Sequence, residues 1–158
     1  NKRIANIIEA FKKIDSQLII SSSGSQTKFL KKISINYENI KFVGVLTENK
    51  YIHYLKNCRA LVMISKDEDF GMSAVEANAC GKAVICSKNG GFLEYIEDKV
   101  NGYFVDENDV ISSIRNIVKK NHNIFNKNSM QRSNKVKYLE YSQFKKKLLN
   151  LLYQPQKR

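Results

Sequence analysis

The sequence is poor in the residues that metal centres, disulfide frameworks and membrane spans require. Its 158 residues include three cysteines and two histidines, and neither set has the spacing of metal ligands. An odd number of cysteines favours buried, reduced thiols in a cytosolic protein. No run of eighteen apolar residues is present, and no signal-peptide pattern opens the chain. We therefore expect a cytoplasmic protein with no bound metal.

The length predicts one domain with an ordinary core and little room for a second. The chain begins at Asn1, without methionine, and enters a helical pattern at once, so we expect a fragment of a longer protein. Internal repeats are absent, and the single proline, Pro155, marks the end of the chain. We expect residues 1–140 to form the domain and residues 141–158 a basic amphipathic helix and tail.

Apolar runs and helical periodicity alternate along the sequence. The patterns predict strands at residues 17–21, 40–43, 60–64, 83–86 and 102–105. They predict helices at residues 2–14, 25–33, 48–57, 71–80, 91–97, 109–119, 127–139 and 142–152. Strands separated by helices indicate an α/β fold of the Rossmann-like type, in which a parallel sheet carries helices on both faces.

Two carboxylates flank the most distinctive strand–helix junction. Glu68 lies in the loop after the third predicted strand, and Glu76 lies inside the helix that follows. A helix N-terminus offers unpaired N–H groups and the positive end of a dipole, which suits a phosphate. Glu76 is about 6 Å further along the axis, where a sugar attached to that phosphate would lie. The alternative is an ordinary βαβ unit with two solvated carboxylates.

The loops after the other strands contain small residues. Gly24, Leu46 and the pair Gly90–Gly91 each follow a predicted strand, as Glu68 does. Ligands of open α/β sheets bind beyond the carboxyl ends of the strands, so these loops are expected to converge. Lys2 would join them after a strand that this sequence does not contain.

The motif around the two carboxylates resembles the donor-binding segment of retaining GT-B glycosyltransferases, the group known as family 4 or glycosyl transferases group 1. That signature reads Glu-x-Phe-Gly, Glu-Ala and a later Gly before a Val-Ile strand, and it is matched at Glu68, Phe70, Gly71, Glu76, Ala77 and Gly81. The similarity extends over about residues 2–105. It includes Lys2-Arg3-Ile4 with Ile8-Glu9-Ala10-Phe11, and the Phe-x-Gly-x-Val-like residues 42–46.

The resemblance implies one half of a GT-B fold, with a UDP- or GDP-linked sugar as donor substrate and no cofactor. It implies catalytic roles for Glu68, which would contact the transferred sugar, and Lys2, which would bind the diphosphate. The implied donor-binding residues are Glu76 at the ribose, Leu46 at the nucleobase edge, the amides of Gly71 and Met72, and Phe70, Gly24, Gly90 and Gly91. The expected function is hexose transfer to a glycan or lipid-linked acceptor in cell-surface polysaccharide synthesis. An N-terminal acceptor-binding domain would be the partner, and the isolated fragment would be inactive.

The sequence also departs from that family. The strand ahead of Lys2, with its Gly-Arg, is absent, and Gly24 alone remains of a Gly-x-Gly after the next strand. We expect the side chains of Phe70 and Met72 to pack in the core. Gly90 and Gly91 could equally form a tight turn, and the role of Arg3 is open.

Asp67 and Asp69 form an Asp-x-Asp pattern, which holds a divalent metal in GT-A glycosyltransferases. The Phe-Gly and Glu-Ala that follow belong to the GT-B pattern, so we favour metal-independent chemistry.

Positive charge is concentrated at the end of the chain. The net charge is +12, and residues 119–158 contribute +10 of it, from eleven basic side chains and Glu140. This region could be a packed helix with a solvated cationic face, or it could bind an anionic membrane surface that carries the acceptor. No motif accompanies the charge that would indicate nucleic acid. Two rival functions remain: a non-catalytic nucleotide-sugar-binding domain and an adaptor for anionic surfaces.

Overall fold

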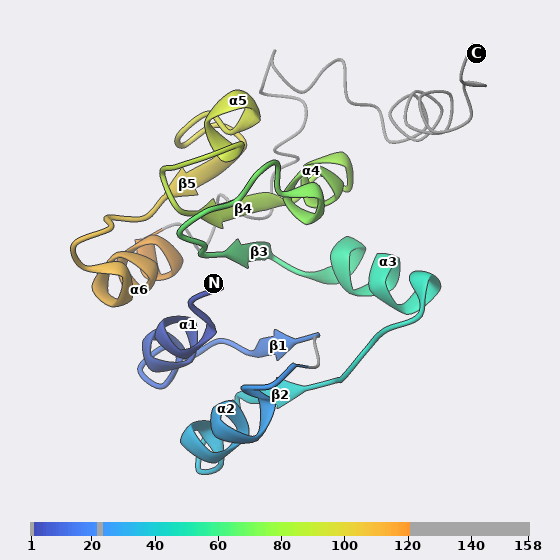
Figure 1. The fold of residues 1–158 in the computed structure, drawn as a ribbon, viewed down its shortest axis with the longest axis vertical. Helices are drawn as coiled ribbons and strands as arrows, with labels where there is room; N and C mark the ends of the chain where they lie inside the picture. Colours follow the sequence, from blue (N-terminus) through green and yellow to red (C-terminus); the bar gives the residue numbers. More distant parts are fainter. Residues whose placement is uncertain (1, 22–23, 121–158) are drawn as a thin grey trace, which may run out of the picture.

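The computed structural model describes residues 2–21 and 24–120, and its strands and helices alternate along the chain (Figure 1). The strands are β1 (Leu18–Ile20), β2 (Ile40–Phe42), β3 (Ala60–Met63), β4 (Ala83–Cys86) and β5 (Gly102–Phe104). The helices are α1 (Ile4–Phe11), α2 (Thr27–Ser34), α3 (Glu48–Asn57), α4 (Met72–Ala79), α5 (Phe92–Tyr95) and α6 (Val110–Lys120). Every strand pairing is parallel. The predicted α/β, Rossmann-like fold is thus confirmed.

Strand β4 shows why the sequence folds in this way. Its four residues are apolar and all buried, because side chains that alternate along the strand enter two different cores. Ala83 and Ile85 join a cluster that includes residues of α1 and α6, whereas Val84 and Cys86 join a cluster with α3, α4 and α5. The helices therefore cover both faces of the sheet.

Most predicted elements agree with the structure within a few residues. The bounds of β4 and α3 are those predicted, and the expected apolar face of the first helix is buried at Ile7, Ile8 and Phe11. The predicted helices at 127–139 and 142–152, and with them the basic unit 141–158, lie outside the described residues.

The strands form two sheets instead of the single sheet expected. One sheet contains β1 and β2, and the other has the order β3-β4-β5. Within the described residues, β1 and β3 each pair on one side only. A hydrogen bond from Arg59 Nη1 to Ser16 Oγ (3.1 Å) connects the residue before β3 with the segment before β1, so the amino ends of these strands lie near each other.

Candidate functional site

The loop that carries Glu68 is fixed to the end of the neighbouring strand. The amide of Ser65 donates to Ser87 Oγ (3.0 Å), and Asn89 Nδ2 donates to the carbonyl oxygen of Ser65 (3.0 Å). The backbone of Lys2 forms an antiparallel bridge with Ser65. Lys2 and Glu68 therefore lie in segments that meet just beyond β3, as the sequence predicted. Sequence reasoning missed the supporting roles of Ser65 and Ser87, which only the pairing of β3 with β4 reveals.

Gly90 and Gly91 pack against the backbone of the same loop. The amide of Gly91 donates to the carbonyl oxygen of Glu68 (3.0 Å). A Cβ atom added at Gly90 would collide with that oxygen, and one added at Gly91 would collide with the carbonyl oxygen of Asp69. Gly90 also has a positive φ of 54°, which disfavours larger residues. The two glycines thus shape the position of Glu68 through close backbone contact.

Helix α4 begins at a glycine in the left-handed conformation. Gly71 has φ 76°, and a Cβ atom there would lie 2.6 Å from Cε1 of Phe92 and 2.7 Å from the hydroxyl of Tyr95. That hydroxyl lies 2.7 Å from the carbonyl oxygen of Phe70, to which it donates. The first bonds into the helix come from the amides of Ala74 and Val75 to the carbonyl oxygen of Gly71.

The amides ahead of those bonds belong to the first turn of α4. At such positions N–H groups have no acceptor within the helix, and the helix dipole is positive. The amides of Met72 and Ser73 hold these positions, one loop away from Glu68. The start of α4 therefore presents backbone N–H donors to an anion. The half-buried carboxylate of Glu68 lies in the loop that leads to it.

Glu76, in the middle of α4, is bonded across to helix α3. The hydroxyl of Tyr51 donates to Glu76 Oε2 at 2.7 Å, and both residues are half-buried. Burial, opposed by a hydrogen bond from Ser73 and reinforced by Glu76, raises the pKa of Tyr51 well above its usual range. The phenol is therefore protonated and able to donate at physiological pH. Sequence reasoning did not single out Tyr51.

Lys2 is exposed and Arg3, beside it, is engaged elsewhere. Arg3 Nη1 contacts Glu107 Oε2 at 2.6 Å, in the segment just before α6. The ion pair fixes the start of α1, and the side chain of Lys2 beside it is exposed at this edge.

Two of the predicted donor-binding residues, Gly24 and Leu46, lie in the loops that follow β1 and β2. Leu46 is half-buried in the segment between β2 and α3, and the amide of Tyr51 donates to the carbonyl oxygen of Thr47 (2.9 Å). Only Thr47 separates Leu46 from α3, the helix that contains Tyr51, the hydrogen-bond partner of Glu76. Gly24 is exposed and follows residues 22–23, which are not described; its amide donates to Thr27 Oγ1 (2.9 Å).

Some expectations about side chains need correction. Phe70 is half-buried and its ring centroid lies 5.5 Å from that of Tyr95, so it packs at the core as expected. Met72 is 37% exposed, and its predicted core position was wrong, because the first residue of α4 faces outward from the packed face of that helix. Of the three cysteines, all of them free, Cys86 is buried, whereas Cys58 and Cys80 are only half-buried.

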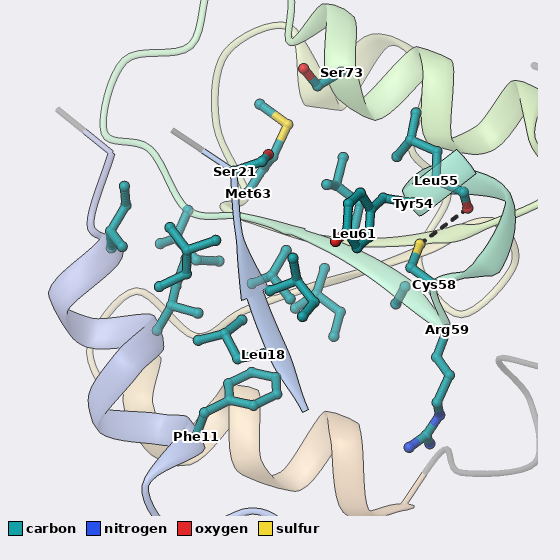
Figure 2. Close-up of a pocket in the computed structure, with 18 of the residues that line it drawn as sticks. Phe11, Leu18, Ser21, Tyr54, Leu55, Cys58, Arg59, Leu61, Met63 and Ser73 are labelled. Carbon is teal, nitrogen blue, oxygen red and sulfur yellow. Dashed lines mark hydrogen bonds between the residues drawn. The ribbon is translucent and has the colours of Figure 1, made fainter. Parts of the chain in front are cut away.

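A cavity of about 690 Å³ lies between the two sheets, and it is mostly apolar. Figure 2 shows the side chains of Phe11, Leu18 and Leu61 at its walls, with Ser73 at one end and Arg59 at the other. Lys2 and Glu68 belong to its lining, but Glu76 does not. The facing strand edges of β1 and β3 form its sides.

Within residues 2–21 and 24–120, no group of three or more acidic, histidine or cysteine side chains is arranged to hold a metal ion. No helix of this part of the chain is both long enough and apolar enough to cross a membrane.

A parallel α/β domain with such an edge is the fold of GT-B glycosyltransferase halves. The structure is similar to that of HepE of Anabaena in complex with UDP and glucose, with a TM-score of 0.72 and 22% sequence identity. The similarity covers 95% of this chain and 44% of that one. It also matches the pneumococcal O-GlcNAc transferase GtfA in complex with UDP and GlcNAc, with TM-score 0.67 and 20% identity, over 96% of this chain and 33% of that one. At these identities the likeness establishes the fold.

Residues 1–138 match the family described as "Glycosyl transferases group 1". The chain therefore belongs to that family of glycosyltransferases. It is 31% identical over 109 residues to an uncharacterized glycosyltransferase of Methanocaldococcus jannaschii, covering 68% of this chain and 31% of that protein. It is 29% identical over 160 residues to the lipopolysaccharide 1,2-N-acetylglucosaminetransferase of Salmonella typhimurium, covering 91% of this chain and 42% of that enzyme. The chain thus spans less than half the length of these relatives.

Proposed function

We propose that this chain is the donor-binding half of a retaining glycosyltransferase. The full-length enzyme would move a hexose from a UDP- or GDP-linked sugar to a glycan or lipid-linked acceptor of the cell-surface polysaccharide type. The Salmonella relative, which by its name transfers N-acetylglucosamine to lipopolysaccharide, supports that acceptor class.

One observation supports this proposal above the others: Lys2, the Glu68 loop and the start of α4 meet at the same edge of β3. A nucleotide sugar carries a diphosphate between two sugars. A helix N-terminus and an ammonium group suit the diphosphate, and flanking carboxylates suit sugar hydroxyls. Glu68 and Glu76 lie on opposite sides of the start of α4 in the sequence, which matches the order of that ligand.

The chemistry follows from the charges that develop during transfer. As the anomeric carbon loses the nucleoside diphosphate, positive charge grows on the sugar and negative charge on the departing phosphate. Lys2 and the amides at Gly71 and Met72 would stabilise the departing phosphate, and Glu68 would orient the sugar.

At the nucleoside end, Glu76 would accept hydrogen bonds from the ribose hydroxyls and the backbone at Leu46 would contact the base. The Gly24 loop would allow close approach of the backbone, and Phe70, Gly90 and Gly91 would hold the Glu68 loop in place. No metal is needed in this scheme, because the diphosphate charge is met by Lys2 and the helix. Transfer by the full-length enzyme should therefore persist in excess EDTA.

Calorimetry against UDP- and GDP-sugars tests the donor site. Glu76→Ala removes a charged acceptor, so we expect affinity to fall by about tenfold to a hundredfold. Glu38→Ala is the control, because Glu38 is exposed and lies in the turn before β2. The absence of binding to any of these donors by folded wild-type protein would reject the proposal.

The isolated chain should bind donor but transfer negligible sugar, because the acceptor site would belong to an N-terminal domain. Measurable transfer by the chain alone would contradict the assignment of the acceptor site to another domain. A non-catalytic nucleotide-sugar-binding protein would instead show no transfer even at full length.

The cavity supports the expectation that a first strand precedes Lys2. Within residues 2–21 and 24–120, no strand lies between β1 and β3, and this is the place of strand 1 in the common doubly wound order 3-2-1-4-5-6. We propose that a strand of the full-length protein occupies it. Hydrogen exchange at Leu18–Ile20 and Ala60–Met63 should then be slower in a version extended ahead of Asn1; unchanged exchange would contradict this.

The basic residues 119–158 lie almost entirely outside the described part of the chain. Their charge of +10 supports attachment to the anionic inner face of a membrane, at about 1 kcal/mol per near-surface cation. We therefore propose a cytoplasmic enzyme peripheral to the membrane. Vesicles with and without anionic lipid, compared for the chain and for a version ending at residue 118, test this; equal binding of both versions would contradict it.

A further inference from the structure

The contact between Tyr51 and Glu76 is the most specific polar contact near the proposed donor site that the sequence did not foretell. The two residues are 25 positions apart, and their oxygens are separated by 2.7 Å. A separation of 2.7 Å is well within the range of a hydroxyl that donates to a carboxyl oxygen, and hydrogen bonds to carboxylates are among the stronger kinds.

The backbone fixes Tyr51 relative to the loop that would hold the base. Its amide donates to the carbonyl oxygen of Thr47, which adjoins Leu46. Tyr51 also packs against the apolar cluster beneath α3 and α4. Its hydroxyl is therefore a fixed donor, whereas a glutamate on a helix surface samples several side-chain rotamers.

We propose that Tyr51 is a positioning residue for Glu76, holding one carboxylate oxygen so that the other faces the ribose of the nucleotide. An ionised carboxylate has room for about four hydrogen bonds. With Tyr51 on Oε2, the oxygen Oε1 has capacity for a ribose hydroxyl. The proposal rests on the donor site proposed above, and it adds a residue outside the motif that defines that site.

The burial of Tyr51 supports this role. The raised pKa of its hydroxyl means that the proton available to Glu76 is retained throughout the pH range in which the protein would work. The bond would thus hold the carboxylate in one orientation whether or not a nucleotide is bound.

The opposing explanation is that Tyr51 only packs α3 against α4. Tyr51→Phe separates the two explanations, because it keeps the ring and removes only the hydroxyl. Tyr54→Phe is the matched control: Tyr54 lies on the same helix and is 37% exposed. Circular dichroism melting of both variants verifies that they are folded.

The test is calorimetric binding of the diphosphate, UDP or GDP, that the wild type binds, and of its 2′,3′-dideoxy analogue. We expect Tyr51→Phe to weaken binding of the ribonucleotide by about five- to tenfold, the effect of one hydrogen bond. We expect less than about a twofold effect on the dideoxy analogue, which has no ribose hydroxyl for Glu76 to accept, by the logic of double-mutant cycles. Tyr54→Phe should change neither.

Equal weakening for both ligands would show a packing role and overturn the proposal, as would unchanged binding of the ribonucleotide. If the wild type binds neither diphosphate, the donor site itself fails, and the positioning role fails with it. That outcome is recognised in the wild-type titration, before any variant is compared.

Discussion

Asn101 should be among the most sensitive positions for stability, because it completes a buried amide network under the site. Asn78 and Asn101 both have no exposed surface. Asn101 Nδ2 donates to Asn78 Oδ1 (2.9 Å) and to the carbonyl oxygen of Tyr95 (2.9 Å). Asn101 Oδ1 accepts from the amide of Glu97 (2.7 Å). The network joins α4, which carries Glu76, to α5 and the segment before β5.

Asn101→Ala would leave three of these polar groups without their partner. The bonds of Asn101 to Asn78 Oδ1 and to the carbonyl oxygen of Tyr95 are buried, and each buried unpaired group costs about 1–3 kcal/mol. The free energy of unfolding should therefore fall by about 3 kcal/mol. For a chain of this length, that corresponds to a decrease in Tm of about 6–12 °C.

Urea unfolding followed by circular dichroism measures this loss. Asn57→Ala is the matched control, because Asn57 is exposed and its side chain donates to the carbonyl oxygen of His53 in its own helix. We expect it to change stability by less than about 0.5 kcal/mol. A loss below about 1 kcal/mol for Asn101→Ala, with an unchanged dependence on urea, would refute the reasoning.

Two further predictions concern the Glu68 loop and the core. Gly90→Ala should lower the free energy of unfolding by about 1–3 kcal/mol, because φ is 54° and the added Cβ would collide with the Glu68 carbonyl oxygen. At Gly24 the added atom would meet none of the described residues within 4 Å, so Gly24→Ala should be nearly neutral. Urea unfolding compares the two variants, and equal losses would contradict this account. Burial raises the pKa of the Cys86 thiol from about 9 to about 12, so the folded state holds this proton more tightly than the unfolded state. Stability from this thiol is complete below about pH 9 and lost as pH rises toward 12. Unfolding measured from pH 8 to 11 should show a smaller decline in Cys86→Ala, and an identical decline would exclude this cause.

The sequence predicted best where local pattern and tertiary environment agree. Strand β4 is an apolar run buried on both faces, and its bounds were those expected. Helix α1 was predicted from the helical spacing of its apolar residues, which defines the buried face of the helix from local sequence alone. Lys2 and the Glu68 loop were placed together correctly, because parallel strands bring their carboxyl ends to one edge.

The sequence predicted less well where a position depends on distant contacts. Met72 is apolar, but the first turn of α4 leaves it exposed. The contact between Tyr51 and Glu76 depends on how α3 and α4 pack against each other, and no short stretch of sequence contains that information. The separation of the strands into two sheets was also missed, because pairing depends on which strand lies next to each edge.

Strands β1 and β3, each of which pairs with a neighbour on one side only within the described residues, affect how the protein behaves in concentrated solution. Strands with a free edge present rows of N–H and C=O groups that pair readily with another chain. The edges of β1 and β3 that line the cavity are of this kind within residues 2–21 and 24–120. At high concentration, the chain should therefore self-associate through these strand edges, and dilution should favour the monomer during preparation.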